Sequence, residues 1–221
     1  MRVVSVNVGL PREIEWQGET VLTGIFKTPV VGRIALDPIN LAGDGQADSV
    51  NHGGLGKAVY AYPVEHYPFW REFLGVDELP FGGLGENVTV EGLDEETTCV
   101  GDVLRMGDAE LVVTQPREPC YKLAVRWNRK DIVRHFLMSG LSGFYLSVRR
   151  TGDLGAGDAI EFIERDPLRV PIAEVNRAHR NASADRAILE RAAKHEILPE
   201  YWRKKVRLHL SKHGAQSGAG E

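Results

Sequence analysis

The first two thirds of the chain consist of short apolar runs separated by glycine and proline. Near the N-terminus, Val4, Val6 and Val8 alternate with Ser5 and Asn7, which is the period-two pattern of a β-strand with one buried face. Many short strands joined by Gly and Pro turns predict a mainly β fold, either a β-barrel or a closed sandwich, extending to about residue 164. The runs that we interpret as strands are VVSVNV, RIAL, KAVYAY, ENVTV, AELVVTQ, FYLSV and AIEFIE.

Two helical segments interrupt these strands. Residues 63–75 have helical periodicity, although Pro68 weakens that prediction. In the stretch 128–140, Ile132, Phe136 and Leu137 lie on one predicted face, and Gly140 marks the end of the helix. A separate segment, GDVLRMGDAELVV, predicts two strands joined by a Gly-Asp turn.

After residue 165 the strand pattern gives way to three predicted helices. Pro171 and Pro199 suit first-turn positions, Ser183 suits an N-cap, and Gly214 suits a helix end. The three stretches are VPIAEVNRAHR, SADRAILERAAKHE and LPEYWRKKVRLHLSKHG. We therefore predict a strand-rich domain over 1–165, a three-helix domain over 166–214 and a disordered tail over 215–221.

Composition narrows the class of protein. Hydrophobic residues make up 43% of the 221 residues, and the net charge is −4, so the surface as a whole is not built for nucleic acid. No apolar run approaches the roughly 18 residues of a membrane helix, and two cysteines cannot form a disulfide framework. We expect a soluble cytoplasmic protein. It lacks G-x-G-x-x-G, Walker, H-E-x-x-H and C-x-x-C motifs.

The segment QPREPCYKL carries the strongest candidate chemistry. Cys120 lies between Arg117 and Lys122, and two prolines hold the segment extended after a predicted strand. Nearby cations favour the thiolate, which is both a nucleophile and a soft metal ligand. The alternative is a buried structural cysteine, the usual state of a free thiol. Cys99, which has no adjacent cation, we interpret as structural.

Two glycine-rich loops are weaker candidates. In the first, residues 43–62, backbone amides could approach an anion, and Asp44, Asp48 and His52 could bind a metal, but an ordinary long turn explains the loop equally well. In the second, FGGLGENVTV, Gly85 and Asn87 stand at the start of a strand, where an amide could contact a heterocycle edge. A simple loop is again an alternative.

The last predicted helix is strongly basic. It could be a docking face for a partner, although a charge run is more often a solvated surface. His209 and His213, four residues apart, could bind a metal but are more often solvated. The cations on this helix are Arg203, Lys204, Lys205, Arg207 and Lys212.

Taken together, these segments resemble MOSC-domain proteins of the YiiM type. The resemblance rests on GDGQAD, NHGG, KAVYAYPVEHY, GENVTVEGL and GDVLRMGDAELVVTQPREPCYKL, and it runs from Lys27 to Lys212. It implies a closed MOSC-type β-barrel with peripheral helices, followed by a small C-terminal three-helix domain. It also implies a molybdenum cofactor (molybdopterin) whose metal is ligated by Cys120. The first 25 residues match less well and carry no information about the site.

The resemblance extends to candidate cofactor-binding residues. Arg117 and Lys122 flank the cysteine as in the family, and we expect them to hold an anionic cofactor. The remaining family signatures are Lys27, His52 and the turn Gly85, Glu86 and Asn87. MOSC domains have also been associated with pyridoxal phosphate, but that chemistry needs a Schiff-base lysine, for which the sequence offers no strong candidate.

The activity that the resemblance implies is reduction of N-hydroxylated bases, such as 6-hydroxylaminopurine, to amines. Two alternatives stay open: a non-enzymatic carrier of the cofactor or of sulfur, and a thiol-nucleophile hydrolase or transferase that uses Cys120 with His52 as base. The chain has no sequence motif for an iron–sulfur cluster, haem or dinucleotide. We therefore expect an external reductase, a flavoprotein, to supply electrons near Cys120.

Overall fold

The computed structural model describes residues 1–47 and 53–214, and the predicted tail 215–221 lies outside these residues. The strands are β1 Arg2–Val8, β2 Arg12–Trp16, β3 Glu19–Thr23, β4 Thr28–Pro29, β5 Arg33–Leu36, β6 Val59–Pro63, β7 Val88–Glu91, β8 Val103–Met106, β9 Ala109–Pro116, β10 Phe144–Arg150, β11 Gly152–Gly155 and β12 Ile160–Glu164. The α-helices are α1 Tyr67–Leu74, α2 Lys122–Trp127, α3 Ile132–Ser139, α4 Ile172–His179, α5 Arg186–Ala192 and α6 Glu200–Gly214. Short 3₁₀ turns precede β6 and α1.

An eight-stranded sheet in the order β12-β8-β9-β10-β6-β7-β1-β4 dominates the fold. Its ladders are antiparallel except for β6 and β7, which run parallel. The sequence predicted a closed barrel, and that prediction is wrong for the described residues, because β12 and β4 form no ladder with each other. The sheet curls enough for one bridge between Arg2 and Ala159, but the edge strand β4 has two residues and ends in Pro29, which has no N–H to donate.

The hairpin of β2 and β3 was not predicted from the sequence. Its turn residues, Gln17 and Gly18, both have positive φ angles of 56° and 82°, as a two-residue hairpin turn of this kind requires. Glutamine is an unusual residue at that position, so the usual Asn-Gly or Asp-Gly signal was absent. The predicted hairpin around Gly107 and Asp108 is confirmed by the pairing of β8 with β9.

The structure confirms most of the predicted helices and corrects their starts. Helix α3 ends at Gly140, whose φ of 77° fits the left-handed C-terminal position. Helix α5 is capped by Asp185 rather than Ser183, because the Asp185 carboxylate accepts the Ile188 N–H at 3.0 Å. Helix α2, which begins just after Cys120, was not predicted. Within the described residues, no helix combines the length and apolar character needed to cross a bilayer.

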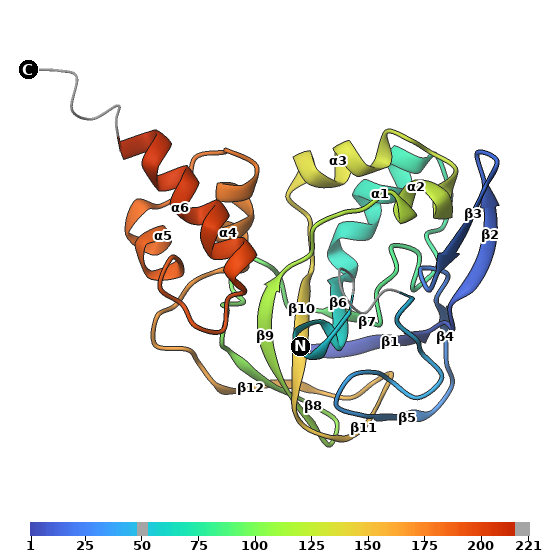
Figure 1. The fold of residues 1–221 in the computed structure, drawn as a ribbon. Helices are drawn as coiled ribbons and strands as arrows, with labels where there is room; N and C mark the ends of the chain where they lie inside the picture. Colours follow the sequence, from blue (N-terminus) through green and yellow to red (C-terminus); the bar gives the residue numbers. More distant parts are fainter. Residues whose placement is uncertain (48–52, 215–221) are drawn as a thin grey trace, which may run out of the picture.

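Two hydrophobic clusters place the helices around the sheet. Helices α4, α5 and α6 lie together on one side (Figure 1), and Val175, Leu189 and Trp202 belong to the same buried cluster as the sheet residues. The other cluster lies under α1, α2 and α3, where Trp70 and Phe136 stack with ring centroids 5.2 Å apart. The C-terminal helices thus share a continuous core with the sheet instead of building one of their own.

Candidate functional site

Two cavities meet at Cys120. The first, of about 100 Å³, lies among the glycine loops, and the second, of about 570 Å³, lies between the sheet and the C-terminal helices. The residues that line both cavities are Lys57, Glu118, Cys120 and Tyr145. A thiol at this junction can contact ligands in either space.

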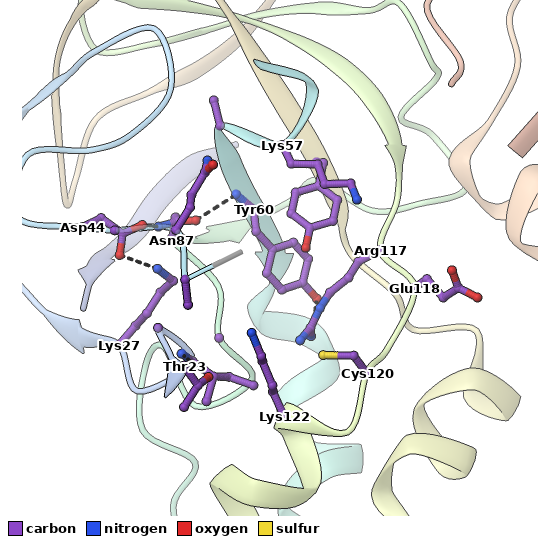
Figure 2. A pocket seen from close by; sticks show the side chains of 18 residues that line it. Thr23, Lys27, Asp44, Lys57, Tyr60, Asn87, Arg117, Glu118, Cys120 and Lys122 are labelled. Carbon is purple, nitrogen blue, oxygen red and sulfur yellow. Dashed lines mark hydrogen bonds and ion pairs between the residues drawn. The ribbon is translucent and has the colours of Figure 1, made fainter. Parts of the chain in front are cut away.

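The local chain path explains where the thiol points. Strand β9 ends at Pro116, residues 117–119 have no regular structure, and the Cys120 carbonyl accepts the Leu123 N–H at 3.1 Å as α2 begins. The half-buried sulfur points toward the Arg117 guanidinium and the end of Lys122 (Figure 2). The sequence predicted this thiol at the end of a strand, and the structure confirms it.

Arg117 is buried, with 6% of its surface exposed. Its Nη1 donates to the Leu84 carbonyl at 2.9 Å, and its guanidinium lies over the rings of Tyr60 and Phe136. Burial disfavours the charge, yet the Tyr60 hydroxyl and other neighbours raise the pKa of Arg117 above its ordinary value. Arg117 lines the first cavity as a fixed positive charge, and removing it would cost stability.

The other cavity cations come from different elements. Lys122 opens α2 and points into the first cavity, and Lys57, which precedes β6, lies over the Tyr145 ring at 5.8 Å (Figure 2). Burial raises the pKa of Tyr60 and of Tyr145, so both phenols are neutral at physiological pH. The cavity therefore presents positive charge on an aromatic wall.

Lys27 and Asn87 are tied together through Asp44. The Lys27 amine forms a buried ion pair with the Asp44 carboxylate, which also accepts the Asn87 Nδ2 at 2.8 Å. Asn87 Oδ1 accepts the Tyr60 N–H at 3.1 Å, so this amide is engaged within the protein instead of being open to a heterocycle. Burial lowers the pKa of Lys27, and the Asp44 carboxylate opposes that shift.

Glu86 supports the glycine turn from behind and is absent from the cavity lining. Its fully buried carboxylate accepts the N–H groups of Gly82 at 2.9 Å and Leu84 at 3.0 Å, and also the Tyr67 hydroxyl. Burial raises the pKa of Glu86, and these hydrogen bonds oppose the shift. Gly85 does line the cavity. Its φ is 88°, and a Cβ there would approach an Ile25 side-chain carbon to 2.9 Å.

Some predicted site residues fall elsewhere. His52 and Asp48 lie outside the described residues. In the ranges 1–47 and 53–214, no three His, Cys, Asp or Glu side chains are grouped to hold a metal, and no histidine lines either cavity. The first 25 residues, from which we expected no information about the site, contribute Thr23, Gly24 and Ile25 to the lining.

The second cavity has a polar and aromatic wall, to which β9, the segment that follows it and α6 all contribute. The Tyr201 hydroxyl donates to Glu118 Oε1 at 2.7 Å, and the Trp202 indole donates to Gln115 Oε1 at 2.8 Å. His179 Nε2 also lies 3.2 Å from the Glu118 carboxylate. His179 and then Tyr201 hold the pKa of Glu118 below its ordinary value, so this carboxylate is charged at neutral pH.

The family model described as the MOSC domain matches residues 48–161, the part of the chain that holds β6 to β11 and Cys120. The chain belongs to the MOSC domain family. The MOSC match includes the thiol, Lys57, Arg117 and Lys122, and it stops before α4.

Individual relatives show that this is a YiiM-type MOSC protein. The protein YflK of Bacillus subtilis is 41% identical over 91% of this chain and 90% of its own length. The crystal structure of YiiM from Geobacillus stearothermophilus is 33% identical, covers 95% of this chain and 98% of that chain, and has a TM-score of 0.74. A Gibberella moniliformis protein named reductase is 31% identical over 74% of this chain, and the matched segment covers 29% of that protein.

The residues that sequence reasoning missed come together only through the fold. Tyr60 and Tyr145 face each other because β6 and β10 pair in that register, with ring centroids 5.2 Å apart. Tyr201 and Trp202 reach the cavity from the far end of the chain. In the sequence, each of these four residues is an aromatic residue at a strand or helix position. Local patterns cannot distinguish an aromatic residue that lines a cavity from one that packs in the core.

We expect alkylation to separate the two thiols. Cys99 is 2% exposed, and burial raises its pKa, with the Asp102 carboxylate adding to the shift, so its thiolate is scarce. Cys120 is accessible through two cavities. Iodoacetamide at pH 7.5 should modify Cys120 at least about tenfold faster than Cys99 in the folded protein. Peptide mass spectrometry over time measures both rates, and equal rates would contradict the assignment of Cys120 as the accessible thiol.

Proposed function

We propose that this protein is a molybdenum-cofactor-dependent reductase of N-hydroxylated bases, with Cys120 as the ligand to molybdenum. The observation that carries the proposal is the position of Cys120, between a cationic, glycine-lined cavity and a larger cavity with aromatic walls. Membership of the MOSC family and the similarity to a protein named reductase support it.

The side chains present fit such a cofactor. A thiolate is a good ligand for a soft metal centre, and phosphate is bound well by cationic side chains and by backbone amides of glycine turns. Cys120 would hold the metal, Lys122 and Arg117 would face the negative charge, and the Gly85 turn leaves room for close approach. The sequence offered no strong candidate for the Schiff-base lysine that pyridoxal phosphate needs. The lining of the first cavity includes three lysines, Lys27, Lys57 and Lys122.

The proposed reaction converts R–NH–OH, two electrons and two protons into R–NH₂ and water. The bound cofactor supplies two-electron oxygen-atom chemistry, and the chain positions the substrate. The larger cavity takes a planar base against Tyr145 and Trp202. Glu118, which is charged and accepts the Tyr201 hydroxyl, would accept a hydrogen bond from the N–H or O–H of the hydroxylamine group.

Two competing functions make different demands on the site. A carrier of the cofactor would need the first cavity alone, so the second cavity beside Cys120 favours turnover. A thiol-nucleophile enzyme would need a base beside Cys120. The proposed base, His52, lies outside the described residues, and the described lining includes no histidine.

Electrons should come from a second protein, which we propose to be a flavoprotein. Docking on the basic face of α6 is less favoured than its sequence implied, because Arg203 and Arg207 pair with Glu200 at 2.9 and 2.7 Å. Cofactor-loaded protein given NADH and hydroxylaminopurine should show no turnover until a reductase is added, whereas reduced viologen should support it directly. Sustained turnover with NADH alone, followed by chromatography of the product, would refute an external donor.

Replacing the thiol tests the metal assignment. Cys120→Ala, produced in a cofactor-competent host, should lose molybdenum and activity with reduced viologen, because alanine offers no ligand. Cys99→Ala is the matched control and should keep both. Metal analysis together with pterin fluorescence measures retention. A Cys120→Ala protein with the molybdenum content of wild type would contradict the ligand assignment, and a metal-loaded wild type without activity on hydroxylaminopurine would favour the carrier.

Removing one hydroxyl tests the role of Glu118. In Tyr201→Phe, kcat/KM for hydroxylaminopurine should fall about tenfold, since a hydrogen bond to a charged group contributes about 1.5 kcal/mol. Tyr201 helps to hold the Glu118 pKa low, so activity should be lost at a higher pH than in wild type as the solution is acidified. Tyr121→Phe, another exposed tyrosine near the site, is the control. An unchanged acidic limb in the pH profile of Tyr201→Phe would remove Glu118 from the proposed mechanism.

A further inference from the structure

Two arginines share one aromatic ring beside the first cavity. The Cζ atoms of Arg12, on β2, and Arg126, on α2, lie 4.1 and 4.9 Å from the centroid of Phe26. Cation–π contacts offset part of the cost of desolvating a guanidinium, but they satisfy none of its N–H donors. Each side chain therefore keeps the planar set of donors that suits a phosphate.

These guanidiniums have no matching acceptor among the described residues. Across residues 1–47 and 53–214, neither the Arg12 guanidinium nor the Arg126 guanidinium has a hydrogen-bond or ion-pair partner. Arg126 is half-buried, and its pKa is lowered first by burial and then by repulsion from Arg12, with the Glu86 charge opposing the shift. An anion placed between the two side chains would relieve that repulsion.

The pair borders the lining of the Cys120 cavity on three segments. Arg12 pairs in register with Thr23, which lines the cavity. Phe26 lies between two lining residues, Ile25 and Lys27, and Arg126 follows Lys122 by one helical turn. A ligand in the cavity can therefore extend past Lys122 to reach both arginines.

We propose that Arg12 and Arg126 form an anion subsite at the rim of the cavity, which takes the phosphate of the ligand bound beside Cys120. The identity of that ligand as a pterin cofactor rests on the proposed function, whereas the affinity of the pair for phosphate does not. Arg117, the arginine beside the thiol, is a poorer candidate because one of its nitrogens already donates to the Leu84 carbonyl and to the Tyr60 hydroxyl.

The first test uses inorganic phosphate and cofactor-free, full-length protein. Isothermal titration should show that Arg12→Gln/Arg126→Gln binds phosphate about tenfold or more weakly than wild type, as expected for losing charged hydrogen bonds. Arg126→Lys should lose less, because it keeps the charge but not the fork. Arg203→Gln/Arg207→Gln is the matched control for net charge, and circular dichroism checks that each variant is folded. Equal phosphate affinity in the Arg12/Arg126 double variant and wild type would overturn the proposal.

The second test identifies the group that the subsite binds. An oxidised, fluorescent pterin derivative is titrated before and after a phosphatase removes its phosphate. Wild type should prefer the phosphorylated form about tenfold or more, and the double variant should bind both forms alike. A double variant that keeps the preference would overturn the proposal. If wild type binds phosphate through these arginines but neither form of the pterin, the subsite stands and the proposed cofactor is wrong.

Discussion

The arrangement of the site depends on burying one positive charge, that of Arg117. A guanidinium taken out of water loses favourable hydration unless its surroundings replace that solvation. Here the Leu84 carbonyl accepts a hydrogen bond and the rings of Tyr60 and Phe136 present their faces. These contacts join the end of β9 to the glycine turn, to β6 and to α3. The thiol three residues later is positioned by that junction.

Around this fixed charge, the nearby carboxylates are tied to partners on the protein. Asp44 pairs with Lys27, Glu86 accepts backbone amides of the glycine turn, and Glu118 accepts the Tyr201 hydroxyl. The lining of the first cavity carries Lys27, Lys57, Arg117 and Lys122 against the carboxylates of Asp44 and Glu118, so positive charge is in excess near the sulfur. An electropositive space beside the thiol favours anionic ligands.

The sequence was informative where local rules decide the structure. The β8–β9 hairpin, the end of α3 at Gly140 and the placement of Cys120 after a strand all follow from short patterns. Partners that depend on long-range pairing could not be foreseen. Nothing near Asn87 in the sequence shows that its amide is engaged by Asp44, and nothing near Arg117 shows that it is buried. The prediction of a closed barrel was wrong for the same reason, because the pairing of edge strands is a tertiary property that short sequence patterns do not determine.

The C-terminal helices illustrate how packing and chemistry are coupled. Trp202 packs in the core shared with the sheet, donates its indole N–H to Gln115 on β9, and lines the cavity beside Cys120. One side chain thus fixes the distance between α6 and the strand that leads to the thiol. The next residue toward the N-terminus, Tyr201, holds Glu118 at the same wall. Because the two residues are adjacent on α6, a shift of that helix would change the shape of the cavity and the position of its carboxylate together. In this structure, the helical segment after the matched MOSC region completes the site built by the sheet.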